Sequence, residues 1–281
     1  MEIGTLKLKN RFLLAPMLEP NDIVFRLLCK KAGCGLTYTG MVNPLSRQKI
    51  YFDDSPTVQL FCNSTRGLKE FVKKYDSFVS LWDFNLGCPS KLAGKLKVGS
   101  FMHSNLEMIE NILKTIRENT KKPVTIKLRK SKNVFKILKI AEKYCDAVAI
   151  HPRTRRQGYS GEADYSYALK LKKKTKLPVI YSGDVSEKNV GKVLKDFDFV
   201  MVGREAIGNP CIFSKLLGRK CNLGFKDYLK LAKKYKLYFR QIKYQVMNFT
   251  RFMKHATHLR RELSFCKTVK EIEEVMKNKK E

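Results

Sequence analysis

The sequence is poor in acidic residues: 26 Asp and Glu stand against 57 Lys and Arg, which leaves a net charge of +31 over 281 residues. It is not poor in apolar residues, which make up 43% of the chain, and 11% of it is aromatic. A disordered polycation is therefore excluded, because such chains lack the aromatic and branched residues that offset chain entropy. We expect a folded protein whose positive field attracts polyanions, nucleic acid first and an anionic membrane surface second.

Signatures of metal binding, export and membrane insertion are also missing. The eight cysteines are scattered, with no C-x-x-C pair and no Cys/His cluster at zinc-ligand spacing, so we expect no metal site and mostly reduced thiols. The longest early apolar run, Phe12 to Ala15, is too short for a signal peptide. No stretch approaches the roughly 20 apolar residues of a membrane span. These absences predict a soluble, cytoplasmic protein without membrane contact, and nothing indicates a protein partner, so we expect a monomer.

Short apolar runs rich in Val, Ile, Phe and Tyr predict eight strands, at 12–15, 36–39, 58–61, 78–85, 124–128, 147–151, 179–182 and 199–202. Segments with helical spacing lie between most of them, at 22–31, 68–74, 105–119, 134–144, 165–173 and 186–194. Strands that alternate with helices indicate a parallel sheet, since a parallel connection must cross over the sheet. Eight such units in about 215 residues fit a (β/α)8 TIM barrel. A doubly wound open sheet is the main alternative, but no G-x-G-x-x-G follows the first strand.

The pattern changes near residue 219. Segments 226–253 and 268–280 have apolar residues at helical spacing among lysines, without strand-like runs. Residues 219–281 hold 18 Lys or Arg and six Asp or Glu. A charge run usually marks a solvated helix face, but these basic residues are interleaved with Tyr228, Tyr235, Tyr238, Tyr244, Phe249 and Phe252, which favours nucleic acid. We therefore divide the chain into a barrel, 1–218, and a small basic helical domain, 219–281.

In a barrel of this kind chemistry takes place at the carboxyl ends of the strands. Gln59, Lys127 and His151 lie within apolar runs there, so each needs a buried polar partner. An inward lysine beside a ring nitrogen or carbonyl of a planar cofactor would stabilise developing negative charge. His151 could hydrogen-bond in a similar way, although a satisfied core histidine is the default interpretation.

Three further strand ends carry residues with recognisable chemistry. Ser182-Gly183-Asp184 and Gly203-Arg204 follow strands seven and eight, where barrel enzymes frequently bind phosphate, although a Gly-Arg pair alone is more often a turn. Asn85-Leu86-Gly87-Cys88-Pro89 turns the chain sharply after the fourth strand and would present the Cys88 thiol at the barrel mouth. A cysteine can act there as a general acid, whereas most free cysteines are simply small buried hydrophobes.

Taken in order, these residues resemble the tRNA-dihydrouridine synthase family. The matching segments are Gly4 to Met17 with Ala15-Pro16-Met17, Phe25-Arg26, Val58-Gln59-Leu60, Asn85 to Ser90, Val124 to Arg129, His151-Pro152-Arg153-Thr154-Arg155 with Tyr159 and Gly161, Gly183-Asp184, and Gly203-Arg204-Glu205 with Gly208-Asn209-Pro210. An ordered set of this length is far more specific than any one motif within it.

The resemblance implies a TIM barrel that holds FMN, is reduced by NADPH or NADH, and reduces a flipped uridine of tRNA to dihydrouridine. Hydride would pass to C6 of uracil and a proton from Cys88 to C5. Carried over by motif, Asn85 and Arg153 would contact the base or the flavin. The flavin-binding positions would be Pro16, Met17, Leu18, Gln59, Lys127, His151, Ser182, Gly183, Asp184, Gly203 and Arg204. The helical domain would help to hold the tRNA.

Three features depart from the family pattern: Leu18-Glu19-Pro20-Asn21 follows Met17, Ser182 stands where Asn is usual, and the helical domain is short. Two alternative functions remain open. One is an FMN-dependent oxidoreductase of the same fold that takes a free pyrimidine or another small metabolite, which would have no need for the basic tail. The other is an RNA-binding protein without chemistry, against which Cys88 and the ordered strand ends argue.

Overall fold

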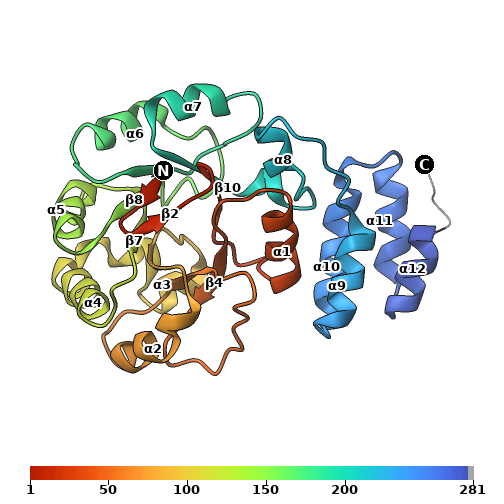
Figure 1. Ribbon diagram of the computed structural model, residues 1–281, viewed down its shortest axis with the longest axis horizontal. Helices are drawn as coiled ribbons and strands as arrows, with labels where there is room; N and C mark the ends of the chain where they lie inside the picture. The colour runs from red at the N-terminus through yellow and green to blue at the C-terminus, as the bar shows by residue number, and fades with distance from the viewer. Residues whose placement is uncertain (278–281) are drawn as a thin grey trace.

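The computed structural model describes residues 1–277 (Figure 1). Its parallel strands are β3 (Phe12–Leu14), β4 (Tyr38–Val42), β5 (Thr57–Leu60), β6 (Leu81–Leu86), β7 (Val124–Lys130), β8 (Ala147–Thr154), β9 (Val179–Tyr181) and β10 (Phe199–Val202). Strands β4 to β10 pair in chain order, and β10 pairs with β3. A parallel bridge between Leu13 and Leu36 makes the remaining join. The predicted (β/α)8 barrel is confirmed.

Helices surround the barrel (Figure 1). They are α1 (Ile23–Lys31), α2 (Leu68–Tyr75), α4 (Leu106–Glu118), α5 (Val134–Tyr144), α6 (Tyr165–Lys172), α7 (Val190–Asp196) and α8 (Ile212–Leu216), with the short α3 (Lys91–Lys95) after β6. The six predicted helical segments are present, but α7 begins at Val190 rather than Ser186. Residues 186–189 form a turn instead, in which the Ser186 N–H donates to Asn189 Oδ1 at 2.9 Å.

An antiparallel hairpin that the sequence did not predict precedes the barrel: β1 (Glu2–Ile3) pairs with β2 (Leu6–Lys7). Two-residue strands are too short for an alternating pattern. Ile3 is fully buried and packs with the apolar side chains of the barrel interior, among them Leu13, Leu81 and Ile180. The hairpin therefore packs on the end of the barrel opposite the site described below, since these residues precede the strand ends that carry the site.

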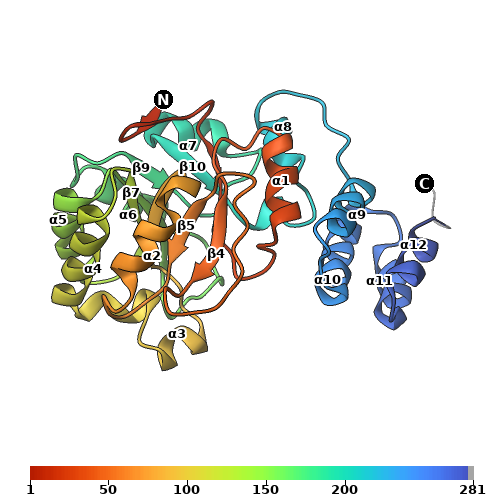
Figure 2. The same cartoon turned by 60° about the horizontal axis from the view of Figure 1, so that its bottom comes forward.

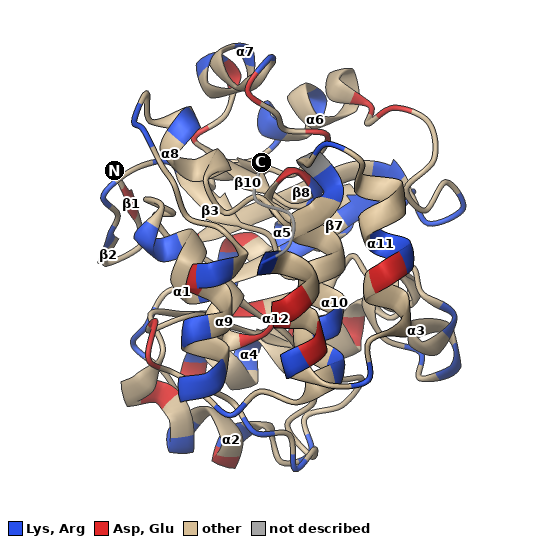
Figure 3. Cartoon of the chain, turned by 90° about the vertical axis from the view of Figure 1, so that its right-hand side faces the viewer, with Lys and Arg blue, Asp and Glu red and all other residues tan. Residues whose placement is uncertain are grey.

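Four helices follow the barrel and lie to one side of it (Figure 2): α9 (Phe225–Lys234), α10 (Phe239–Phe249), α11 (Ala256–Phe265) and α12 (Val269–Lys277). The prediction of one segment over 226–253 is wrong in detail, because the chain breaks at Lys236, whose φ is +51°. Helix α11 was not predicted, and the last three residues of the predicted segment 268–280 lie outside the described residues. The charged residues of α9 to α11 are mainly basic, whereas α12 has three glutamates beside Lys270 and Lys277, and both colours are visible on it (Figure 3).

The aromatic residues of this helical region do not all face solvent. Tyr228 and Phe249 are buried and pack against each other with ring centroids 5.9 Å apart, so for them the nucleic-acid interpretation is wrong and the core interpretation holds. Tyr238, by contrast, is 80% exposed. The interleaving of aromatic and basic residues in the sequence therefore reflects the amphipathic packing of α9 and α10 as much as any binding surface.

Six cysteines are free thiols, in agreement with the expectation that most are reduced, but Cys211 and Cys221 form a disulfide that was not predicted. Their separation of ten residues matches no motif, and their pairing depends on the turn that follows α8. Within residues 1–277, no helix combines the length and the apolar character needed to cross a bilayer.

Candidate active site

A cavity of about 770 Å³ opens at the carboxyl ends of the barrel strands. Twelve of the fourteen predicted site residues line it: Pro16, Met17, Leu18, Asn85, Cys88, Lys127, His151, Ser182, Gly183, Asp184, Gly203 and Arg204. They come from six strand ends that are far apart in the sequence. The parallel arrangement brings them to one edge of the barrel, as the fold prediction required.

The other two predicted residues, Gln59 and Arg153, lie behind this lining. Gln59 is fully buried, and its amide bonds to Asp83 and Asn85. Arg153 is 2% exposed and makes a bidentate ion pair with Asp184, through Nη1 to Oδ1 at 3.0 Å and Nη2 to Oδ2 at 2.6 Å. Both residues support side chains that line the cavity, without lining it themselves.

The turn after β6 fixes the position of the Cys88 thiol. Asn85 Oδ1 accepts from the backbone N–H groups of Gly87 and Cys88, each at 3.0 Å. Gly99 packs so closely behind the turn that a Cβ there would lie 2.7 Å from the Cys88 carbonyl oxygen. Of the six free cysteines in the described chain, Cys88 alone is not buried, and its Sγ lies 3.3 Å from Ser90 Oγ. The sequence folds here to expose one thiol at the cavity.

Lys127 lies on β7, opposite Asn85 on β6 and Ala149 on β8. Desolvation, followed by the positive charge of Arg129, lowers the pKa of its amino group to about 8. Within residues 1–277 the amino group makes no hydrogen bond or ion pair. A half-buried cation without an acceptor is costly, so the site is suited to a ligand that supplies one.

His151 lines the cavity at the end of β8 as a neutral ring. Burial, followed by the positive charges of Lys127, Arg129, Arg153 and Arg204, lowers the pKa of His151 to about 2. Arg153 Nη1 donates to His151 Nε2 at 3.1 Å. Because a neutral ring carries one proton and Nε2 accepts, that proton is on Nδ1, which leaves a hydrogen-bond donor for a ligand.

The end of β9 provides a positively charged corner. Asp184 adopts a left-handed conformation with φ of +48° and pairs with both Arg153 and Arg204. Two guanidinium groups share this single carboxylate, so one positive charge is left for an anion. Gly183 beside it must be glycine, because a Cβ would lie 2.8 Å from the Cβ of Ala163. This corner has the charge and the close backbone approach that a phosphate group needs.

Sequence reasoning missed Arg129 and Tyr159, which also line the cavity. Arg129 Nε donates to the Gly87 carbonyl at 2.8 Å and its Nη1 to the Gly158 carbonyl at 2.7 Å. The ring of Tyr159 is 61% exposed and lies between two guanidinium groups, 5.2 Å from that of Arg129 and 5.7 Å from that of Arg204. Arg129 could have been found from the strand period, since it follows Lys127 by two residues and so shares its face.

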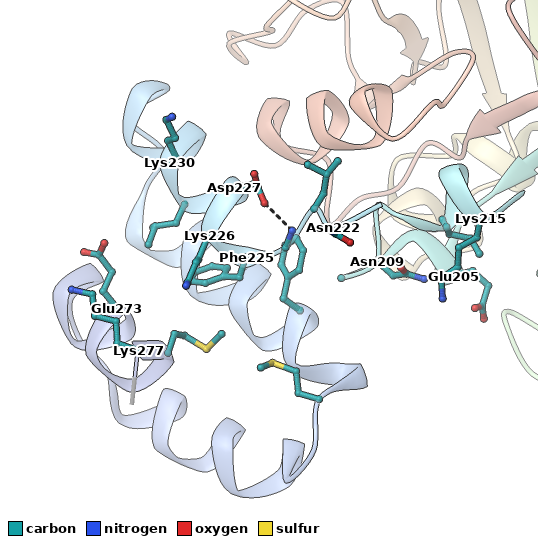
Figure 4. Close-up of a pocket in the computed structure, with 18 of the residues that line it drawn as sticks. Glu205, Asn209, Lys215, Asn222, Phe225, Lys226, Asp227, Lys230, Glu273 and Lys277 are labelled. Atoms are coloured by element: carbon teal, nitrogen blue, oxygen red, sulfur yellow. Dashed lines mark hydrogen bonds between the residues drawn. The ribbon is translucent and has the colours of Figure 1, made fainter. Parts of the chain in front are cut away.

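A second, larger hollow of about 1740 Å³ lies between the barrel and the helical region (Figure 4). Ser186 and Glu205 line both this hollow and the first cavity, so the two are neighbours. Its lining includes six lysines, drawn from both parts of the chain: Lys188, Lys215, Lys226, Lys230, Lys233 and Lys277. Four acidic residues line it as well, Glu187, Glu205, Asp227 and Glu273, so lysines exceed acidic groups by two.

Comparison with known proteins gives a family and a fold. The family model for dihydrouridine synthase matches residues 13–281. The tRNA-dihydrouridine synthase B of Escherichia coli K12 is 32% identical over 237 residues, which cover 77% of this chain and 74% of the relative. That of Pasteurella multocida is 30% identical and covers 76% and 70%. Among solved structures, morphinone reductase with tetrahydroNAD has a TM-score of 0.52 at 13% identity, covering 79% of this chain and 90% of that one. TcOYE with pHBA has a TM-score of 0.60 at 9% identity, with 85% and 97% covered. At these identities the solved structures speak for the fold alone.

Proposed function

The chain belongs to the dihydrouridine synthase family, and from that premise we propose which of its residues reduce uridine in tRNA. The activity is the reduction of the C5–C6 double bond of a tRNA uridine to dihydrouridine. The observation that carries the assignment of residues is the cavity at the barrel mouth, which is lined by one accessible thiol, a half-buried amine and a neutral histidine. The reaction needs a hydride, a proton and a site that holds the base between their sources.

A flavin, which we take to be FMN reduced by NADPH or NADH, supplies the hydride for C6 of uracil when it is bound. The residues present fit this group. Lys127 has a charge without an acceptor, and His151 Nδ1 carries a free proton for a ring oxygen or nitrogen. Gly183, Gly203 and Arg204 would hold the phosphate, and Pro16, Met17, Leu18, Ser182 and Asp184 would complete the walls. We assign Gln59 a supporting role, because it is fully buried behind the wall.

Cys88 is the proton donor in this proposal. Its thiol lies at the cavity mouth, on a turn held by Asn85 and Ser100, so its position does not depend on substrate. Transfer of the thiol proton to C5, the carbon bonded to the one that receives hydride, completes the reduction and leaves a thiolate that solvent reprotonates. Asn85 lines the cavity and has one amide hydrogen unused, which can donate to a uracil carbonyl. Arg153 acts through Asp184 and His151 without contacting the base.

The helical region, 219–281, is proposed to hold the tRNA. A base inside stacked RNA cannot reach a recessed site, so it must flip out at a cost of a few kcal/mol. Contacts between phosphates and a basic surface offset that cost. The hollow beside α9 supports this role, because six lysines line it and it neighbours the catalytic cavity at Ser186 and Glu205.

Replacement of Cys88 by alanine tests the proposal. We expect Cys88→Ala to retain bound flavin, seen by its absorbance, while the rate of dihydrouridine formation in tRNA falls about 100-fold or more, the usual scale for loss of a general acid. Cys145→Ala is the matched control, since Cys145 is a buried thiol that follows α5 and lies away from the cavity. A Cys88→Ala enzyme as fast as the wild type would show that another group donates the proton.

A further inference from the structure

A line of buried hydrogen bonds crosses the barrel interior and ends at the turn that carries Cys88. Thr125 Oγ1 donates to Asp83 Oδ1 at 2.6 Å, and Gln59 Nε2 donates to Asp83 Oδ2 at 2.6 Å. Gln59 Oε1 accepts from Asn85 Nδ2 at 2.7 Å, and Asn85 Oδ1 accepts from the Cys88 N–H at 3.0 Å. Thr125, Asp83 and Gln59 are each at most 1% exposed. Water therefore cannot substitute for any of these partners.

Asp83, at one end of this line, determines which way the side-chain amides of Gln59 and Asn85 point. A side-chain amide has a donor end and an acceptor end of nearly the same shape, so either orientation of Gln59 would fit the space. Both carboxyl oxygens of Asp83 accept, Oδ1 from Thr125 and Oδ2 from Gln59, so the donor end of Gln59 faces Asp83. The acceptor end of Gln59 then requires the donor end of Asn85. What remains for the turn is the acceptor end of Asn85, which is the end that the Gly87 and Cys88 N–H groups need.

The described part of the chain shows no other role for a carboxyl group that is buried as deeply as that of Asp83. Within residues 1–277 it makes no close ion pair, and it is not among the residues that line the cavity. Burial raises its pKa to about 7, against the opposing effect of the bonds from Thr125 and Gln59 and of the positive charge of Lys127. A buried carboxylate rarely stabilises a core, and an apolar residue of similar size would do so better. Its presence is explained by what it orients.

We propose that Asp83 is a positioning residue for Cys88: by fixing the direction of the Gln59 and Asn85 amides, it shapes the turn that holds the thiol. This inference rests on the proposed role of Cys88 as proton donor. It also gives Gln59 a function that does not require contact with the flavin. The side chains of Asp83, Gln59 and Asn85 form a hydrogen-bonded row, which we call the amide relay.

Asp83→Asn tests the relay with little change of shape. The new amide has only one acceptor atom, so it cannot accept from both Thr125 and Gln59 while keeping both amides in their present direction. We expect kcat for dihydrouridine formation to fall about 10- to 100-fold, the scale of a small misplacement of a reacting group. The KM for tRNA and the affinity for flavin should stay within about threefold, because no cavity-lining side chain is changed.

A compensating variant separates orientation from simple loss of stability. In Gln59→Glu/Asp83→Asn the carboxylate is at residue 59 instead of residue 83. It accepts from the side-chain amides at 83 and 85, so Asn85 again presents its oxygen to the turn. We expect this double variant to recover kcat at least tenfold over Asp83→Asn. Gln59→Glu alone should lose activity, because it places two carboxylates side by side in the core. A role for Asp83 in stability alone predicts no such recovery.

The matched control is Asp76→Asn. Asp76 also accepts from a threonine hydroxyl and a side-chain N–H, those of Thr120 and Trp82, but it lies outside the barrel, so kcat should not change. Bound flavin and the Tm show whether each variant is folded. Should Asp83→Asn alone fail to fold, an active double variant beside an inactive Gln59→Glu carries the same evidence.

Two results overturn the inference alone: a wild-type kcat in Asp83→Asn while Cys88→Ala is inactive, or a folded double variant no faster than Asp83→Asn. Full activity in Cys88→Ala would instead overturn the proposed function and this inference with it. The two failures are thereby distinguished in a single set of assays.

Discussion

His151 is held in one protonation state by its neighbours. It is 7% exposed, and burial together with the surrounding cations lowers its pKa to about 2. The ring therefore stays neutral throughout the range in which the protein works, with Nε2 accepting from Arg153 and Nδ1 donating. A histidine in this state is a fixed hydrogen-bond donor and takes no part in proton transfer, which is consistent with a proton that comes from Cys88.

The depressed pKa of His151 makes stability depend on pH. Below its usual pKa of 6.5 the unfolded chain binds a proton at this residue and the folded protein does not, so stability is lost as pH falls. The loss approaches about 1.4 kcal/mol per pH unit. Between about pH 7 and pH 5.5, the free energy of unfolding by urea should therefore drop about 1 to 2 kcal/mol more in the wild type than in His151→Asn. Equal drops in the two proteins would contradict this.

Single residues also show how far the sequence could predict the site. Strand ends were recognised from apolar runs, and parallel strands then brought twelve of the fourteen residues to one cavity. The distance of each residue from the barrel mouth, measured along its strand, was not predictable. Gln59 aligns with Asp83 on β6, one layer below the mouth, and this register is a property of the closed sheet. Asp83 itself lay hidden in an apolar run, although it shares a strand face with Asn85.

Among the secondary-structure elements, the link between α1 and α10 joins the barrel to the helical region. Asp22 Oδ1 accepts from the Phe25 N–H at 2.9 Å and caps α1, while Oδ2 accepts from Gln245 Nε2 at 2.6 Å. Asp22 is 7% exposed and Gln245 is fully buried. Burial raises the pKa of Asp22, and the bond from Gln245 counteracts this. Because Asp22 ends the loop that begins at Met17, the helical region contacts a wall of the catalytic cavity through this bond.

Gln245→Ala should loosen the helical region before it affects the barrel. The substitution leaves a buried carboxylate oxygen without its partner, which costs about 1 to 3 kcal/mol. We expect faster amide hydrogen exchange in α9 to α12 than in the wild type, with little change in β3 to β10. Asn248→Ala on the same helix is the control, because the Asn248 amide only bonds back to the Tyr244 carbonyl. Uniformly faster exchange over the whole chain would argue against a separate unit.

The sequence predicted well those helices and strands that pack on the barrel, because their apolar residues recur at a regular spacing. The errors lie where the structure depends on the conformation of a few residues and has no repeated apolar spacing to reveal it. The break between α9 and α10 occurs at a lysine in the left-handed conformation, Lys236, which no composition rule marks. The hairpin of β1 and β2 is too short to have a period, and the disulfide between Cys211 and Cys221 depends on where the chain turns after α8.

For the whole molecule, the charged residues behind the net charge of +31 are unevenly distributed. Residues 226–261 hold 11 basic residues and one acidic residue, whereas α12 contains Glu271, Glu273 and Glu274. Glu273 pairs with Lys233 of α9 at 2.6 Å, so part of the basic charge is neutralised where α12 packs (Figure 3). The basic residues that remain are on α9 to α11, and three of them, Lys226, Lys230 and Lys233, line the hollow beside the catalytic cavity.

Charge reversal on α9 tests whether the hollow beside it, or the net charge as such, holds tRNA. Lys226 and Lys230 are exposed, one helical turn apart, and line the hollow. Each phosphate contact that is lost should lower the slope of log affinity against log salt by about 0.7 to 0.9. We therefore expect Lys226→Glu/Lys230→Glu to bind tRNA more weakly and with a shallower salt slope, while bound flavin is unchanged.

Lys69→Glu/Lys73→Glu is the matched control for that variant. These two lysines are also exposed and one turn apart, but they lie on α2, away from the helical region (Figure 1). The two double variants have the same net charge, so long-range attraction to a polyanion falls equally in both. If tRNA contacts the hollow beside α9, only the first loses salt slope. If both weaken binding to the same extent with parallel slopes, the charge acts as a diffuse field, and the tRNA is held elsewhere.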